Sequence, residues 1–215
     1  MTDDHAGDEP RTRDDLAARR GLETEVYQPA EDSALLAAAA VDQVAADHRV
    51  LEVGTGSGWV ASRVAAETGA SVIGSDLNPA ACRRARERAR ADRREGKPGY
   101  DVVRADLVAP VRDGAVDVVL FNPPYLPTDP DAEWDDPMEL ALSGGESGRD
   151  VIEPFLDSVG RVLTPGGFVL LLVSSLTGFD AVLDRAADAG FDAERVREES
   201  YPFEVLTILR LDPSA

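Results

Sequence analysis

The tetrapeptide Asn122-Pro123-Pro124-Tyr125 has the residue types to hold a planar nitrogen group. It follows an apolar run at residues 116–121 that predicts a buried strand of a parallel sheet. Two prolines end a strand because neither donates a backbone hydrogen bond, and the residue before a proline is disfavoured in the helical conformation. Asn122 should therefore lie on a stiff backbone at the carboxyl end of a strand, where open α/β sheets bind ligands. A strand-ending turn with a polar cap would use the same residues.

A glycine-rich turn after the first predicted strand is a second candidate for ligand binding. A short apolar strand that ends in Glu52 leads into Gly54, Gly56 and Gly58, and a helix is expected to begin near Trp59. Glycine allows a tight turn and a close approach of the backbone to a ligand. Dinucleotide sites prefer the spacing G-x-G-x-x-G, whereas this turn has G-x-G-x-G with Glu52 before it. The acid favours a cationic or hydroxyl-bearing cofactor over a pyrophosphate.

Two further predicted strands also end in acidic residues. Asp76 lies at the position where a doubly wound fold binds ribose hydroxyls, although it could also be a cap at the entry of the next helix. Asn78 should cap that helix, which begins at Pro79. After the third strand, Asp106 could accept a hydrogen bond from an exocyclic amino group, and Leu107 offers an apolar edge to a ring. Carboxylates at successive strand ends predict one shared ligand site.

The remaining elements predict an α/β fold in which helices and strands alternate in one domain. A helix at residues 34–41 is preceded by acids suited to its first turn and by Tyr27, an aromatic residue that could cover a ligand. Later segments predict a helix at 150–163, a strand at 168–173, a helix at 179–189 and an antiparallel hairpin formed by 193–197 and 203–211. Residues 1–20 are expected to be a mobile acidic segment, and residues 21–215 to form the domain.

Composition restricts the class of protein. One cysteine and two histidines among 215 residues exclude an internal disulfide framework and argue against a structural metal. No apolar run is long enough for a membrane span, and residues 1–13 lack the apolar core of a secretory signal, so we expect a cytoplasmic protein. The net charge of −19, with Lys97 as the single lysine, favours a salt-adapted surface over a basic partner, because the acids are spread along the chain. The same charge disfavours nucleic acid as a partner.

With these motifs together, the chain resembles the HemK-like branch of the class I S-adenosylmethionine-dependent methyltransferases. The resemblance covers about residues 22–211 and is closest to the short archaeal and eukaryotic enzymes that methylate a glutamine side chain of translation release factors. It rests on the glycine turn, Asp76-Leu77-Asn78-Pro79, Asp106-Leu107, the NPPY tetrapeptide and two flanking segments at 27–33 and 144–149. It implies a single Rossmann-like domain with a mostly parallel seven-stranded sheet, an antiparallel C-terminal hairpin and helices on both faces.

The resemblance also implies roles for individual residues. The cofactor, S-adenosylmethionine, would contact Tyr27, Ser33, Glu52, Gly54, Gly56, Gly58, Asp76, Leu77, Asp106, Leu107 and Asn122. The substrate would be held by Asn122, Pro123, Pro124 and Tyr125, of which Asn122, Pro123 and Tyr125 would be catalytic. Gln28 replaces a more common glutamate of the family. A small zinc-binding activator protein would form a heterodimer along the edge strand at residues 100–104, where Tyr100, Val102 and Val103 would be exposed without it.

Other functions fit parts of the pattern. The exocyclic amine of adenine in DNA or RNA presents the same geometry as an amide, and a protein lysine is a third possible acceptor. A nicotinamide-dependent oxidoreductase is disfavoured by the glycine spacing. A catalytically silent scaffold is disfavoured because every expected site residue is present.

Overall fold

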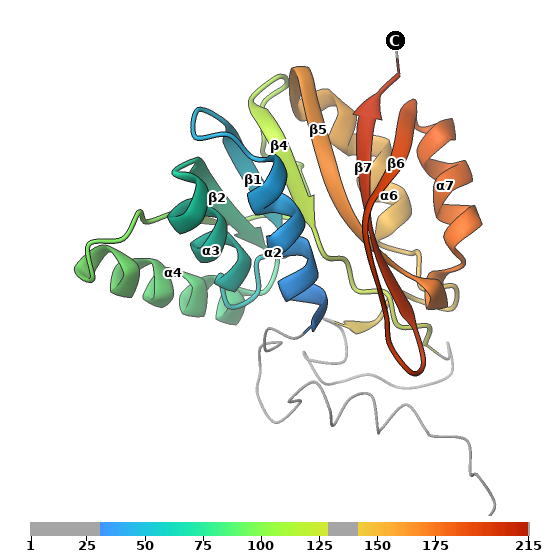
Figure 1. Ribbon diagram of the computed structural model, residues 1–215, viewed down its shortest axis with the longest axis horizontal. Helices are drawn as coiled ribbons and strands as arrows, with labels where there is room; N and C mark the ends of the chain where they lie inside the picture. The colour runs from blue at the N-terminus through green and yellow to red at the C-terminus, as the bar shows by residue number, and fades with distance from the viewer. Residues whose placement is uncertain (1–30, 129–141, 215) are drawn as a thin grey trace, which may run out of the picture.

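The computed structural model describes residues 31–128 and 142–214, which form a seven-stranded sheet between two layers of helices (Figure 1). The strand order is β3-β2-β1-β4-β5-β7-β6. The strands are β1 (Arg49–Val53), β2 (Ser71–Asp76), β3 (Asp101–Arg104), β4 (Val116–Phe121), β5 (Leu163–Ser174), β6 (Phe191–Ser200) and β7 (Val205–Pro213). The α-helices are α2 (Glu31–Gln43), α3 (Trp59–Thr68), α4 (Pro79–Arg94), α6 (Ile152–Val159) and α7 (Phe179–Asp188), and the short 3₁₀ helices are η1 (Gly160–Val162) and η2 (Ser175–Thr177).

Alternation along the central strands creates one core on each face of the sheet. Val118 and Leu120 of β4 pack with α2, α3 and α4, whereas Val119 and Phe121 pack with α6 and α7. Both layers are visible in Figure 1. Strands β3, β2, β1, β4 and β5 pair in parallel, and β7 pairs antiparallel with β5 and β6. This arrangement confirms the predicted fold class and the C-terminal hairpin. Among the described residues, no helix combines the length and apolar character needed to span a bilayer.

Several predicted boundaries differ from the structure. The helix expected at 150–163 is shorter, because α6 ends at Val159 and is followed by η1. The strand expected at 168–173 begins earlier, because β5 starts at Leu163, and its pairing with β4 shifts register between Val116 and Val118.

The edge position of β3 is confirmed, but the expectation that Tyr100 is exposed there is wrong. Strand β3 begins one residue later, at Asp101, and Tyr100 is only 1% exposed. Its hydroxyl donates to the carbonyl oxygen of Ala85 in α4 at 2.8 Å. The side chain of Tyr100 therefore anchors α4 on the sheet and adds no exposed apolar surface at the edge.

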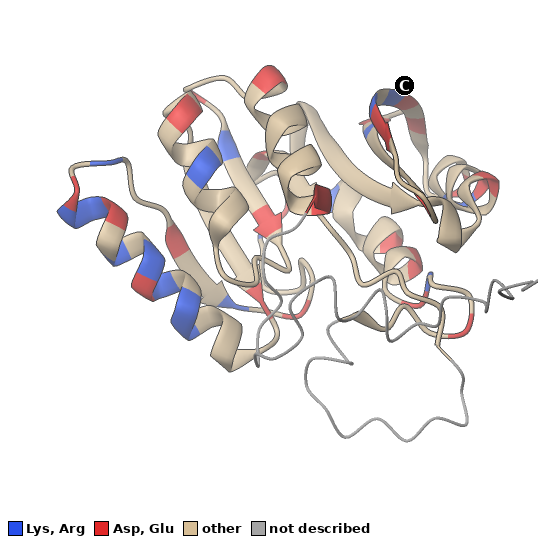
Figure 2. Ribbon diagram, turned by 60° about the horizontal axis from the view of Figure 1, so that its bottom comes forward, with Lys and Arg blue, Asp and Glu red and all other residues tan. Residues whose placement is uncertain are grey.

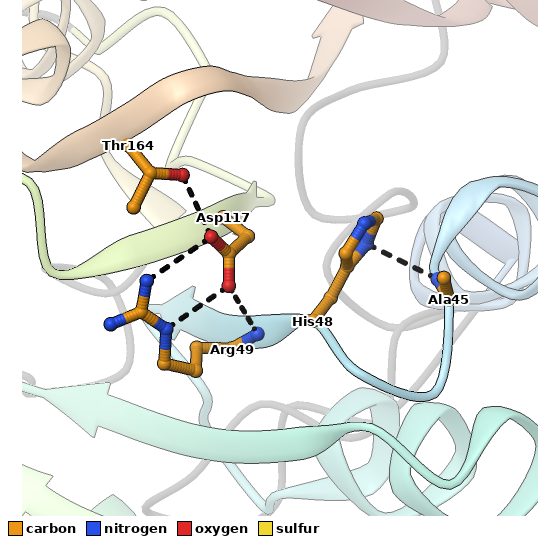
Figure 3. A network of polar contacts seen from close by, with 5 residues as sticks. All are labelled: Ala45, His48, Arg49, Asp117 and Thr164. Carbon is orange, nitrogen blue, oxygen red and sulfur yellow. Dashed lines mark hydrogen bonds and ion pairs between the residues drawn. The ribbon is translucent and has the colours of Figure 1, made fainter.

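A polar network joins three strands at the end of the sheet opposite the carboxyl ends of the parallel strands (Figure 3). Asp117 of β4 accepts the backbone N–H of Arg49 at 2.8 Å, two guanidinium contacts from the same arginine at 3.1 and 3.2 Å, and the hydroxyl of Thr164 at 2.7 Å. These hydrogen bonds hold the pKa of Asp117 well below its usual range. The single acid in the apolar run of β4 therefore fastens β1, β4 and β5 together.

Candidate active site at the carboxyl ends of the strands

A cavity of about 620 Å³ opens at the carboxyl ends of β1, β2 and β4 and beside the segment that follows β3. It is lined by the first turn of α2, the glycine turn, the start of α4 and the NPPY tetrapeptide. Its volume lies in the range of sites for small ligands. The position agrees with the general rule that ligands of open α/β sheets bind beyond the carboxyl ends of the strands.

The glycine turn after β1 is held by the carboxylate of Glu52. Oε2 of Glu52 accepts the Thr55 hydroxyl at 2.6 Å and the Ala61 backbone N–H at 3.0 Å. Glu52 is almost fully buried, and burial raises its pKa to about 8. Positive φ values of 66° at Gly54 and 54° at Gly56 explain why glycine occupies both positions. Glu52 therefore lines the cavity and also fixes the shape of the turn.

Asp76 connects this turn to the next strand end. Its Oδ2 accepts the Gly56 N–H at 2.9 Å, and its Oδ1 accepts the Asn78 N–H at 2.8 Å. Burial raises the pKa of Asp76, although these hydrogen bonds oppose the shift. The side chain of Asn78 accepts from Ala80 N–H and caps α4, which begins at Pro79 as expected. Asp76 therefore satisfies two backbone donors at the cavity wall, and Asn78 provides the helix cap.

Leu107, three residues after the end of β3, has an unusual backbone conformation. Its φ of 44° is the only positive value at a non-glycine residue in the described part of the chain. A leucine in this region is strained, and such strain is concentrated at functional sites. Asp106 and Leu107 both line the cavity, and Asp106 is exposed.

The NPPY tetrapeptide forms another wall of the cavity. The side-chain oxygen of Asn122 is buried and has no hydrogen-bond partner among the described residues, although it lines an open cavity. A buried acceptor without a partner is costly and usually has a functional reason. Tyr125 is 3% exposed and lines the same cavity.

A glycine-rich segment after residue 141 packs against the backbone of Tyr125 and Leu126. Leu126 N–H donates to Leu142 O, and Gly144 N–H donates to Leu126 O, at 3.0 and 2.9 Å. A Cβ on Gly148 would lie 2.7 Å from the carbonyl oxygen of Tyr125. This contact excludes larger residues and gives a physical reason for a glycine at this position.

The structure brings most of the predicted site residues together around one cavity. They are Ser33, Glu52, Gly54, Gly56, Asp76, Leu77, Asp106, Leu107, Asn122, Pro123, Pro124 and Tyr125. Gly58 is not among the lining residues, and a Cβ there would lie 2.0 Å from the Tyr100 hydroxyl, so packing explains this glycine. Tyr27 and Gln28 lie outside the described residues.

Sequence reasoning missed several residues that line the cavity. They include Asp32, Thr55, Trp59, Asn78, Ala105, Phe121, Leu126, Leu142 and Val151. Adjacency to a predicted strand end or to the glycine turn could have indicated Thr55, Trp59, Ala105, Phe121 and Leu126. No local signal distinguishes Leu142 and Val151, which reach the cavity through tertiary packing. Within the described ranges, no group of three or more histidine, cysteine or acidic side chains could hold a metal ion.

Comparison with known proteins places these features in a family. Residues 50–145 match the family described as "Methyltransferase domain". A protein of Methanocaldococcus jannaschii, named as a candidate protein N5-glutamine methyltransferase, is 37% identical over 188 residues, which cover 87% of this chain and 92% of that protein. The protein named "Methyltransferase HEMK2" of Homo sapiens is 32% identical over 201 residues, covering 91% of this chain and 93% of that protein.

A solved structure extends the comparison. The E. cuniculi Mtq2-Trm112 complex, described as responsible for methylation of the translation termination factor eRF1, matches with a TM-score of 0.68 and 28% sequence identity. The match covers 89% of this chain and all of that one.

Proposed function

Because this chain belongs to the HemK-like class I methyltransferases, we propose that it methylates the side-chain amide of a glutamine in a translation release factor. Enzymes of this class use S-adenosylmethionine as the methyl donor. The observation that carries the proposal is the buried, unpartnered oxygen of Asn122 at the wall of the cavity. The names of the M. jannaschii and E. cuniculi relatives, one for a glutamine and one for a termination factor, support the choice of acceptor.

The residues around the cavity fit S-adenosylmethionine. We propose that Asp76 and Leu77 contact the ribose and its surroundings, that Asp106 and Leu107 contact the adenine ring, and that Gly54 and Gly56 allow close approach of the backbone. Ser33 and Glu52 line the cavity where the amino-acid portion of the cofactor could bind. We also propose that Tyr27 covers the bound cofactor. When bound, the donor supplies a methyl group made electrophilic by a sulfonium. The protein must therefore orient the nucleophile and exclude water.

Asn122 and Pro123 provide acceptors for a planar nitrogen. We propose that Oδ1 of Asn122 and the carbonyl oxygen of Pro123 each accept one N–H of the substrate amide. An amide nitrogen is a poor nucleophile because its lone pair is delocalised, so two fixed acceptors would orient that lone pair and stabilise positive charge as it develops. Pro123 and Pro124 restrict the backbone that holds these acceptors. The donor N–H groups of a substrate would also satisfy the buried oxygen of Asn122.

Tyr125 would pack against the plane of the amide. Its position is supported by the close approach of Gly148 and by the hydrogen bonds that join residues 126 and 144. A strong general base is not required, since an amide nitrogen becomes acidic once it has been methylated. Glu52 is not suited to that task, because Oε2 already accepts two hydrogen bonds from the glycine turn.

The edge strand β3 is proposed to bind a small zinc-binding activator protein as a heterodimer. Two apolar side chains on the open face of β2 and β3 support this proposal: Ile73 is 38% exposed and Val103 is 41% exposed. Register places both on one face, since Ile73 pairs with Asp101, two residues before Val103. A partner strand would pair the edge and cover this apolar surface.

We also propose that the acidic surface is an adaptation to high salt and that the protein acts in the cytoplasm. Acidic residues are distributed over many helices and strands, which is consistent with adaptation to high salt (Figure 2). Methylation of a release factor would take place in the cytoplasm.

Mass spectrometry tests the proposed reaction. The chain is incubated with isotopically labelled S-adenosylmethionine, a release factor and the activator, and the Gly-Gly-Gln loop of the factor is then sequenced by fragmentation. One methyl on the glutamine side chain is the expected result. A methyl found only on a lysine, or only on added DNA or RNA, would overturn the assignment.

A further inference from the structure

Helix α4 carries a concentration of positive charge that contrasts with the rest of the chain. Seven of its sixteen residues are arginines and two are acidic, although the whole chain has 41 acidic and 22 basic residues. Figure 2 shows these basic residues as a series along α4, at one end of the molecule. Ala81, Ala85 and Ala89 form the buried side of the helix.

Four of these arginines form a stripe beside strand β3. Arg83, Arg86, Arg90 and Arg93 follow one another at intervals of three, four and three residues, so they lie along one face of the helix. Two of them touch the edge strand directly. Arg86 donates to the carbonyl oxygen of Val102 at 3.2 Å, and Arg93 donates to that of Tyr100 at 2.8 Å. The arginine stripe therefore borders the free edge of the sheet.

The two carbonyl groups held by these arginines face away from the sheet. The N–H of Ala105 donates to Asp76 O at 3.0 Å, so residues 101, 103 and 105 direct their backbone groups toward β2. Residues 100 and 102 therefore direct theirs outward, as alternate residues of an edge strand do. A partner strand would share these acceptors with the guanidinium groups of Arg93 and Arg86, or displace those groups, since a carbonyl oxygen has two lone pairs.

The other two arginines of the stripe are available to a partner. Arg83 and Arg90 are exposed, and neither makes an ion pair or side-chain hydrogen bond within residues 31–128 and 142–214. Arginine side chains bind carboxylates through two parallel hydrogen bonds, which survive screening by salt better than long-range attraction does. On a chain of net charge −19, these two arginines form a local site that can attract a carboxylate-bearing partner.

We propose that the arginine stripe of α4 and the edge of β3 form one docking surface for an acidic extended segment of a partner protein. Backbone N–H groups of that segment take the carbonyl oxygens of Tyr100 and Val102, and its carboxylates pair with Arg83 and Arg90, while Arg93 stays paired with Asp101. This inference rests on the activator interface proposed above and adds the chemistry of the segment that occupies it. A protein is favoured over nucleic acid because a long polyanion would also meet the acidic surface around the stripe.

Binding of the activator to matched double variants tests the docking surface. The probe is the activator protein, titrated by calorimetry against the wild type, Arg83→Ala/Arg90→Ala and Arg195→Ala/Arg197→Ala. The last pair removes the same charge from β6, at the opposite edge of the sheet. S-adenosylmethionine binding confirms that each variant is folded. The stripe variant is expected to bind the activator about fivefold to tenfold more weakly in low salt, with a smaller salt dependence, while the β6 variant matches the wild type.

The other outcomes overturn the inference. Equal affinities for both variants would show that the arginines do not contact the partner. Absence of activator binding to the wild type would contradict the proposed interface on β3. Loss of affinity for a labelled RNA, without loss for the activator, would assign the stripe to nucleic acid. Release-factor methylation by the chain alone is measured in parallel. Methylation without activator binding would support the proposed reaction and contradict the docking surface.

Discussion

Oδ2 of Asp76 accepts the backbone N–H of Gly56 at 2.9 Å, and this hydrogen bond joins the carboxyl ends of β1 and β2. The contact forms because Gly56 has a φ of 54°, which a residue with a side chain rarely adopts. One carboxylate thus shapes the glycine turn while the same residue lines the cavity. We therefore expect both functions of Asp76 to contribute to the binding of a ligand at this wall.

Replacement of Asp76 should therefore weaken S-adenosylmethionine binding more than it weakens the fold. Asp76→Ala leaves the N–H groups of Gly56 and Asn78 without their acceptor and removes a candidate partner of the ribose. We expect a loss of affinity of about 100-fold, equivalent to about 3 kcal/mol, by calorimetric titration. Asp101→Ala on the neighbouring strand is the control and should bind normally. Equal affinities for the two variants would exclude Asp76 from the site.

The affinity for S-adenosylmethionine should rise with pH. Burial raises the pKa of Glu52 to about 8, so the carboxyl of the free protein is largely protonated at pH 6. A cationic ligand favours the ionised form and must displace that proton, so affinity should increase by up to about tenfold per pH unit and level off above pH 8. Calorimetry between pH 6 and 9 measures the effect. Glu52→Gln should abolish the pH dependence of the affinity. An unchanged pH dependence in that variant would show that another group titrates.

Asp117 should contribute to stability without affecting methyl transfer. Hydrogen bonds from Arg49 lower its pKa, so the stabilisation is present above the unfolded-state pKa of about 4 and decreases as the pH falls below that value. Asp117→Asn should lower the free energy of unfolding by about 1 kcal/mol at pH 7, and by less at pH 3, in urea titrations. Asp113→Asn, which breaks an exposed ion pair with Arg161, should have little effect at either pH. An equal loss for Asp117→Asn at both pH values would contradict the role of its charge.

The sequence was sufficient to locate the ends of the strands, because each end combines a local apolar run with an acid, a glycine turn or two prolines. Asp76 and Asn122 were placed correctly at such ends, and the parallel sheet then brings them to one cavity. The capping role of Asn78 was also predictable, since Asn followed by Pro is a local signal for a helix start.

Tertiary packing explains what the sequence could not provide. Tyr100 was predicted on the exposed edge, because an aromatic residue beside two valines is typical of a strand. Strand β3 begins one residue later than expected, and Tyr100 packs beneath α4. Its hydroxyl occupies the space that a side chain at position 58 would need. Glycine is therefore needed at position 58 because of packing against Tyr100, although its spacing in the sequence resembles that of a cofactor-binding turn. The contact of Gly148 with Tyr125 likewise joins segments more than twenty residues apart.

The proposed role of Asn122 can be measured as the single-turnover rate of Asn122→Ala, with S-adenosylmethionine bound and a release factor as the acceptor. We predict normal cofactor affinity and a rate reduced at least about 30-fold, which corresponds to about 2 kcal/mol of lost transition-state stabilisation. A variant that binds the cofactor normally and methylates glutamine at close to the wild-type rate would contradict the role of Asn122 as the acceptor of the substrate amide.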